Sequence, residues 1–234
     1  MALRRVLAAL DFLHGPVNLT HSGVHAGNLL IGIKDESQLA EFEEAELVRP
    51  SSRKVANGIT VHVSQFMLES FGPLYLCDFG EARVGTHHEG IANPIQYRAP
   101  EIILGMSWVH AVDMWSIGIL AWDLLEPESL FHLYDANDTA RNEAHHLANM
   151  VALLGPPPLE FLKRSLKSRE YWNENGEWRG IVPISMDRTL DSLPKSSEGG
   201  DKDVFLDLIR GLLRWLPEER LNSYEAFSQP WVSG

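Results

Sequence analysis

Apolar residues at helical spacing predict an amphipathic helix over residues 2–14. Leucines recur there every three or four residues: Leu3, Leu7, Leu10 and Leu13. Gly15 and Pro16 then interrupt the pattern. Two short apolar runs further along, Leu29–Ile31 and Leu74–Cys77, are typical of strands. Polar segments rich in possible ligands lie beside both runs, so we expect any functional residues to lie near these two strands.

The stretch between the two predicted strands, residues 34–73, has the character of an insertion. Asp35 and Gln38 predict a capping box at the start of an acidic helix. Six acids in this helix carry half of the net charge: Asp35, Glu36, Glu41, Glu43, Glu44 and Glu46. Asn57-Gly58, between two β-prone runs, predicts a two-residue hairpin turn. The acidic run is either a solvated helix face or a contact for a basic partner.

The second half of the chain is predicted to be mainly helical. Helices are expected over three ranges: 110–126, 142–154 and 203–215. The first is apolar on nearly every side, which is typical of a helix at the centre of a core. Trp115 and Trp122 are seven residues apart and share one face of it. Residues 165–202 contain many turn-forming residues and are expected to be rich in loops.

Composition narrows the class of protein. The 234 residues are 44% hydrophobic and 22% charged, which is typical of one or two globular domains. With 20 basic and 32 acidic residues the net charge is −12, which disfavours nucleic acid and anionic membrane surfaces and favours basic protein partners. No apolar stretch approaches the roughly 20 residues that a bilayer requires. A single cysteine, Cys77, cannot form an internal disulfide and fits a reducing cytoplasmic or nuclear compartment.

Six short motifs follow one another in a fixed order: His21-Ser22-Gly23, Asn28, Asp78-Phe79-Gly80, Tyr97-Arg98-Ala99-Pro100-Glu101, Asp113 to Gly118, and Arg220. Each is weak by itself, since Asp78-Phe79-Gly80 could be a simple exit from a strand and Asn28 could cap a turn. In this order, beside these strands and helices, they resemble the C-terminal lobe of a eukaryotic protein kinase. Arg98, the insertion and the runs at 153–158 and 213–220 are most similar to fungal relatives of the serine/arginine-rich protein kinases.

The resemblance implies a mostly α (α+β) protein-kinase-like fold over residues 1–234, with residues 34–73 inserted between the two strands. It implies ATP-dependent phosphorylation of serine or threonine hydroxyls in basic proteins rich in arginine and serine. The cofactors would be ATP and Mg²⁺, with Asn28 and Asp78 as metal ligands, because a carboxylate and an amide are hard oxygen donors that suit this ion.

The same resemblance assigns structural roles to several motif residues. Glu101 would form a buried ion pair with Arg220, and Asp113 would accept backbone hydrogen bonds from the catalytic loop. Four further residues belong to the matched motifs without an assigned chemical step: His21, Phe79, Gly80 and Arg98. These roles concern the fold and do not by themselves indicate turnover.

The chain departs from the kinase pattern at two positions of the catalytic loop. Gly23 occupies the place of the aspartate that accepts the proton of the substrate hydroxyl, and glycine has no group for this role. Ser22 is too weak a base to replace it at neutral pH. His25 occupies the place of a lysine that steadies the transferred phosphate, a role that histidine would fill partially when protonated. No catalytic base is therefore assigned.

A second departure concerns length. Only 20 residues precede His21, and most of them belong to the first predicted helix. We therefore expect the N-terminal lobe, with its glycine-rich loop, strand lysine and helix glutamate, to be absent. Three interpretations follow: a catalytically impaired serine/threonine kinase, a pseudokinase fragment that serves as a protein-binding module, or an incomplete reading frame. An incomplete start would not explain Gly23.

Two further features have competing interpretations. Thr86 lies between Asp78 and Glu101 and is either an exposed loop residue or a regulatory phosphorylation site. The pairs His87-His88 and His145-His146 suggest metal binding, but adjacent side chains point apart on a helix or strand. We therefore expect no structural metal site at either pair.

Overall fold

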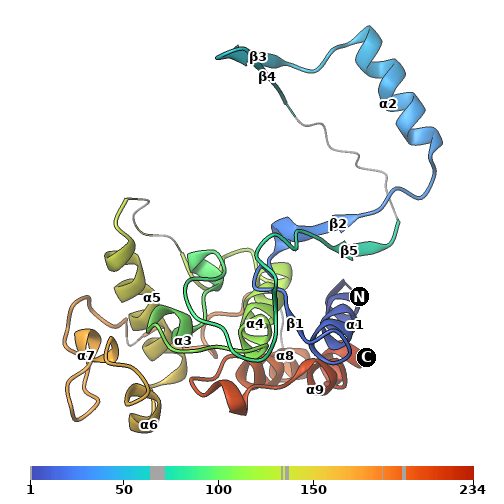
Figure 1. The fold of residues 1–234 in the computed structure, drawn as a ribbon. Helices are drawn as coiled ribbons and strands as arrows, with labels where there is room; N and C mark the ends of the chain where they lie inside the picture. Colours follow the sequence, from blue (N-terminus) through green and yellow to red (C-terminus); the bar gives the residue numbers. More distant parts are fainter. Residues whose placement is uncertain (1, 64–71, 133, 135–136, 186, 197–198) are drawn as a thin grey trace. The chain divides into compact units, whose positions relative to one another are not determined.

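A computed structural model describes residues 2–63, 72–132, 134, 137–185, 187–196 and 199–234 of the chain. The chain forms two compact units, Met1–Asn28 with Leu76–Gly234, and Leu29–Tyr75 (Figure 1). We call them the main unit and the small unit. The insertion predicted over residues 34–73 lies inside the small unit, and its residues 64–71 are outside the described part.

The secondary structure is dominated by helices. The α-helices are α1 (Ala2–His14), α2 (Ser37–Val48), α3 (Pro100–Ile103), α4 (Ala111–Leu125), α5 (Thr139–Leu154), α6 (Leu159–Leu162), α7 (Ser168–Tyr171), α8 (Gly199–Leu212), α9 (Ser223–Phe227) and α10 (Pro230–Ser233). The 3₁₀-helices are η1 (Ala26–Asn28), η2 (Ile95–Tyr97) and η3 (Pro217–Glu219). The strands are β1 (Leu19–Thr20), β2 (Leu29–Ile31), β3 (Arg53–Ala56), β4 (Ile59–His62), β5 (Leu74–Leu76) and β6 (Arg83–Val84). A mostly α fold is therefore confirmed.

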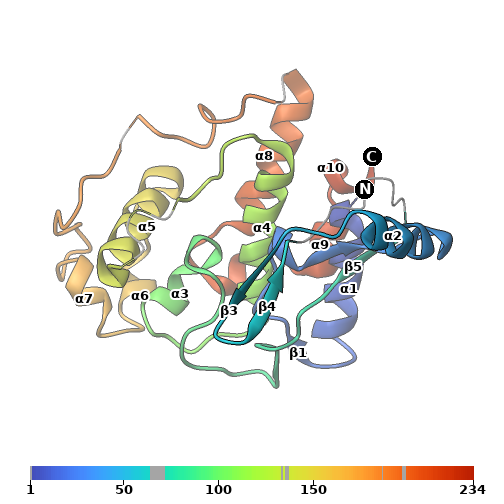
Figure 2. The same ribbon diagram turned by 90° about the horizontal axis from the view of Figure 1, so that it is seen from above.

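Helix α4 is the centre of the main unit. Every residue from Val112 to Trp122 is buried, as its apolar sequence predicts. It packs against α8, while α1 packs against α9 (Figure 2). Gly118 is needed for this packing, because a Cβ atom there would lie 2.8 Å from the Leu213 side chain. Helices α1, α4, α8 and α9 thus pack together in the main unit.

The predicted boundaries of two helices are wrong. Helix α5 starts at Thr139 rather than at residue 142, because the Asp138 side chain accepts a hydrogen bond from the Arg141 amide and caps the first turn. Helix α8 covers Gly199–Leu212 rather than 203–215. Trp215 lies beyond it, and its indole donates a hydrogen bond to the Gly155 carbonyl at the end of α5.

The small unit contains α2 and two strand pairs. Strands β3 and β4 form an antiparallel hairpin, and the two turn residues, Asn57 and Gly58, have φ of 52° and 75°. This left-handed backbone is the geometry that Asn-Gly predicts. The predicted capping box is wrong: the N-cap is Glu36 without a side-chain bond, and the Asp35 carboxylate instead accepts from the Ser37 amide. None of the α2 residues is buried.

In the part of the chain that the structure describes, no helix combines the length and the apolar character needed to cross a membrane.

A buried histidine in α5 should make stability depend on pH. Burial lowers the pKa of His146 from 6.5 to about 4, and its Nε2 donates a hydrogen bond to the Arg98 carbonyl at 3.1 Å. Below pH 6.5 the unfolded chain therefore binds a proton that the folded chain excludes. This residue should remove up to about 3 kcal/mol of unfolding free energy as the pH falls from 6.5 to 4.

Urea denaturation at pH 7 and pH 4.5 tests this prediction. His146→Gln should show a smaller loss of unfolding free energy between the two pH values than the wild type. His87→Gln is the matched control, because His87 is exposed. Equal losses in the wild type and in His146→Gln would contradict a role for His146.

Candidate functional site

The candidate site is built where β1 and β6 pair. These strands run antiparallel, with Leu19 opposite Val84 and Thr20 opposite Arg83. The loop that leaves β1 begins at His21, and Asp78 lies shortly before β6. The strand pair therefore brings two segments that are far apart in the sequence to one edge of the main unit.

Asp113, in the first turn of α4, holds the backbone of the loop after β1. Its fully buried carboxylate accepts hydrogen bonds from the amides of His21 and Ser22, both at 2.8 Å, and contacts His14 Nε2 at 2.8 Å. Ser22 has a φ of 53°, a left-handed conformation that is unfavourable for a side-chain-bearing residue. The bonds to Asp113 stabilise this strained conformation.

His21 is buried between the two segments. Burial is the main cause that lowers its pKa, so the ring is neutral at neutral pH. Its Nε2 donates a hydrogen bond to the Cys77 carbonyl at 3.2 Å, and the ring meets the Phe79 ring edge-on with centroids 4.8 Å apart. Its Nδ1 is buried without a hydrogen-bond partner in the described structure. His21 therefore links the loop to the segment before Asp78 without carrying charge.

Asn28 and Asp78 line one cavity of about 390 Å³. The Asn28 side-chain amide donates to the Gly23 carbonyl at 2.9 Å, and the Cys77 amide donates to the Asn28 carbonyl at 2.9 Å. One Asp78 oxygen accepts from the Gly80 amide at 3.2 Å, and Asp78 has a φ of 67°. The two residues predicted as metal ligands, Asn28 and Asp78, therefore line the same cavity.

This donor set fits magnesium bound together with a phosphate. One carboxylate and one amide are hard oxygen donors, and Mg²⁺ usually keeps several waters and substrate oxygens in addition to one or two protein ligands. Among the described residues no group of three or more His, Cys, Asp or Glu side chains is placed to hold a metal ion. Asn28 and Asp78 could therefore hold the ion only as partial ligands.

Gly23 lines the cavity without contributing a functional group. A Cβ atom there would lie 3.5 Å from Asn28 Nδ2 and 3.5 Å from His21 Nδ1, which are ordinary contact distances. The position therefore has room for a larger side chain, and no clash requires glycine. The other position that departs from the kinase pattern, His25, also lines this cavity.

Sequence reasoning missed two residues that line the cavity, Glu81 and Asn93. The Asn93 amide donates to the Ser22 carbonyl at 3.2 Å, and its side chain donates to Ser116 Oγ at 2.8 Å. Asn93 has a φ of 62° and precedes Pro94, so the Asn-Pro pair was the available signal for a turn at this point. Glu81 accepts a hydrogen bond from the Ser22 hydroxyl through its carbonyl.

Arg98 connects the segment after Asp78 with helix α5. It is buried, donates to the carbonyls of Ala92 and Asn93 at 3.2 Å each, and lies 3.7 Å from Glu143. Burial lowers its pKa. Thr86, in the same segment, is exposed.

Glu101 and Arg220 join α3 to the segment before α9. The two terminal guanidinium nitrogens of Arg220 each donate to the Glu101 carboxylate at 2.7 Å, and the side chains of Glu101 and Arg220 are 2% and 0% exposed. Arg220 also donates to the carbonyls of Ala111 and Arg214, and lies over the Trp115 ring at 5.0 Å. Each of the three guanidinium nitrogens of this buried cation therefore has a hydrogen-bond acceptor.

Comparison with known proteins shows the family to which the chain belongs. Residues 1–232 match the family described as protein kinase domain. A serine/threonine protein kinase of Aspergillus fumigatus is 40% identical over 236 residues, covering 99% of this chain and 56% of that protein. Serine/threonine-protein kinase AFC3 of Arabidopsis thaliana is 27% identical over 239 residues, and the match covers 97% of this chain and 54% of the AFC3 chain. The chain thus spans about half the length of these relatives.

A solved structure gives the same fold. The crystal structure of a kinase domain superposes with a TM-score of 0.69 at 23% sequence identity, covering 99% of this chain and 64% of that chain.

Proposed function

Since the chain belongs to the protein kinase family, with serine/threonine kinases among its relatives, we propose that it is a member whose phosphoryl transfer is strongly impaired. The observation that carries this proposal is Gly23. The loop around it keeps its bonds to Asp113 and Asn28, but the position of the base offers no carboxylate. Ser22 cannot replace it, because a serine hydroxyl is too weak a base at neutral pH.

The other residues of the candidate site would bind magnesium and phosphate rather than catalyse phosphoryl transfer. Asn28 and Asp78 would hold Mg²⁺, and the ion would neutralise phosphate charge when ATP is bound. His25 would add positive charge beside the phosphate only when protonated. Asp113 would hold the backbone of the loop after β1 through its bonds to the His21 and Ser22 amides. The geometry therefore supports binding of a magnesium–phosphate group better than removal of a hydroxyl proton.

The substrate or partner class is proposed from charge and resemblance. The net charge of −12 favours a basic polypeptide, and the similarity to serine/arginine-rich protein kinases favours one with arginine and serine repeats. We propose that the chain binds this partner in the cytoplasm or nucleus. A chain with a single cysteine forms no internal disulfide and is suited to these reducing compartments.

A phosphorylation assay tests the impairment. The purified 234-residue chain, with magnesium-ATP and an arginine/serine-repeat peptide, should show no phosphate incorporation above that of its Asp78→Asn variant, since no base accepts the hydroxyl proton. The measurement is radiolabelled phosphate transfer over several hours. Turnover in the wild type that Asp78→Asn abolishes would overturn the proposal.

A matched pair of variants examines Gly23 itself. Gly23→Asp supplies the carboxylate, and Gly23→Asn supplies the same volume without a base. Both should fold, because a Cβ atom at this position makes only ordinary contacts. If turnover rises in Gly23→Asp and not in Gly23→Asn, the missing carboxylate limits catalysis. If the two variants have equal rates, another part of the chain also limits catalysis.

A protein-binding module without catalysis is the second candidate. Exposed apolar side chains in the small unit favour it: Leu47, Val48, Val55, Ile59 and Val61. Isothermal titration of the chain with magnesium-ATP separates the candidates. Nucleotide binding without transfer supports an impaired kinase, and the absence of nucleotide binding supports a binding module that has lost the kinase site.

A further inference from the structure

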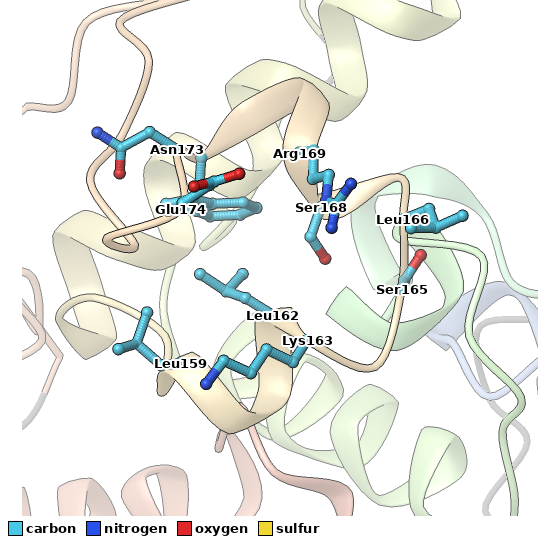
Figure 3. A pocket seen from close by; sticks show the side chains of 10 residues that line it. Leu159, Leu162, Lys163, Ser165, Leu166, Ser168, Arg169, Asn173 and Glu174 are labelled. Atoms are coloured by element: carbon cyan, nitrogen blue, oxygen red, sulfur yellow. The ribbon is translucent and has the colours of Figure 1, made fainter.

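A second pocket lies between α6 and α7, among residues 159–174 of the main unit (Figure 3). Its volume is about 280 Å³, close to the lower limit of ligand pockets. Leu162 and Trp172 line it and are buried, while Leu159 and Leu166 line it and are exposed. The pocket therefore has an apolar interior with an open entrance, and its size suits one or two amino-acid side chains.

Ser168 gives this pocket an unsatisfied polar group. The residue is 3% exposed, and its hydroxyl has no hydrogen-bond partner in the described structure. Figure 3 shows this hydroxyl pointing into the pocket. The neighbouring Ser165, by contrast, donates to the Leu104 carbonyl. An unpaired buried hydroxyl costs about 1–3 kcal/mol, so a ligand with a hydrogen-bonding group at this point would gain from it.

The entrance carries positive charge on an otherwise acidic protein. Residues 163–169 contain four of the 20 basic residues and no acid. Arg164 and Lys167 form ion pairs with carboxylates elsewhere in the main unit. Lys163 and Arg169 line the pocket, are exposed, and have no ionic partner among the described residues. The residues that line the pocket therefore include two cations without a described ionic partner and one acid, Glu174, so the pocket carries a net positive charge.

We propose that this pocket docks a peptide segment of a partner protein that carries one large apolar side chain next to aspartate or glutamate residues. The apolar side chain occupies the space beside Leu162 and Trp172. A peptide carbonyl accepts a hydrogen bond from the Ser168 hydroxyl. The acidic residues meet Lys163 and Arg169 at the entrance. The proposal does not rest on catalysis, since none of these residues belongs to the candidate kinase site.

Fluorescence polarisation with labelled peptides tests the chemistry of the ligand. The probe is Asp-Asp-Leu-Phe-Asp, and the matched controls are Lys-Lys-Leu-Phe-Lys and Asp-Asp-Ser-Ser-Asp. The probe should bind the purified chain at least tenfold more tightly than either control. No binding of the probe, or equal binding of any control, would overturn the proposal.

Variants of the chain test the location. Lys163→Glu combined with Arg169→Glu should weaken probe binding at least tenfold, and Ser168→Ala should weaken it about threefold to tenfold, as expected for one hydrogen bond. The control is Arg5→Glu combined with Arg49→Glu, which reverses the same number of exposed charges elsewhere and should leave binding unchanged. If the control pair weakens binding as much as the pocket pair, the effect is one of net charge and the proposed site is wrong.

Discussion

Replacing Glu101 with alanine should lower the free energy of unfolding by about 3–5 kcal/mol, because it leaves the Arg220 guanidinium buried without its counter-charge. Both side chains are almost fully excluded from solvent, and the two bonds between them are 2.7 Å long. Water cannot reach the cation to compensate. Urea denaturation at pH 7 measures the loss.

A surface pair provides the control for this prediction. Glu128 is 71% exposed and lies 2.7 Å from the Lys195 ammonium group, so Glu128→Ala should change the unfolding free energy by less than about 1 kcal/mol. The double variant Glu101→Ala/Arg220→Ala should lose less than the sum of its single variants, because it leaves no charge unpaired. A loss below 1 kcal/mol for Glu101→Ala would show that the buried pair does not stabilise the main unit.

Replacing Asp113 with alanine should have the second largest effect, a loss of about 3 kcal/mol or more. The substitution leaves two buried amides, those of His21 and Ser22, without acceptors, and each unsatisfied amide costs about 1–3 kcal/mol. It also releases the left-handed backbone at Ser22. Urea denaturation gives the loss, and hydrogen exchange at the two amides locates it.

The control for Asp113 is Asp207, a helix residue that is 74% exposed and pairs with Arg210 at 3.5 Å. Asp207→Ala should change the unfolding free energy by less than about 1 kcal/mol. Unchanged hydrogen exchange at His21 and Ser22 in Asp113→Ala would contradict the role of Asp113 in holding the loop.

Much of the helical framework could be predicted from local patterns. The first helix and the central helix were predicted within a residue of their observed ends, because their apolar residues repeat at the helical period and adjoining residues end the pattern. The Asn57-Gly58 turn was predicted because few other residue pairs tolerate its left-handed backbone. Helix starts were predicted less well: α5, capped by Asp138, begins three residues before its predicted start, and Asp35 does not form the capping box predicted for α2.

The candidate site was predictable only in part. Asn28 and Asp78 were recognised through a family pattern, but their meeting at one cavity depends on the pairing of β1 with β6, which joins residues more than 60 positions apart. Glu81 and Asn93 were missed, since no short motif marks a residue that reaches the cavity through a loop. The Ser168 pocket had no sequence signal, because a serine in a loop-rich region is ordinarily exposed.

By itself, the sequence determined the mostly helical class, the hairpin, the order of the kinase motifs and the absence of a carboxylate at residue 23, because each depends on the identity of residues close together in the chain. Only the tertiary structure decided which polar groups are buried and which of them are paired. The carboxylate oxygens of Asp113 and the guanidinium nitrogens of Arg220 all have hydrogen-bond partners, whereas the Ser168 hydroxyl has none in the described structure. The reason is physical: hydrogen-bond partners and solvent access arise from segments far apart in the sequence, and they exist only once the core around α4 has packed.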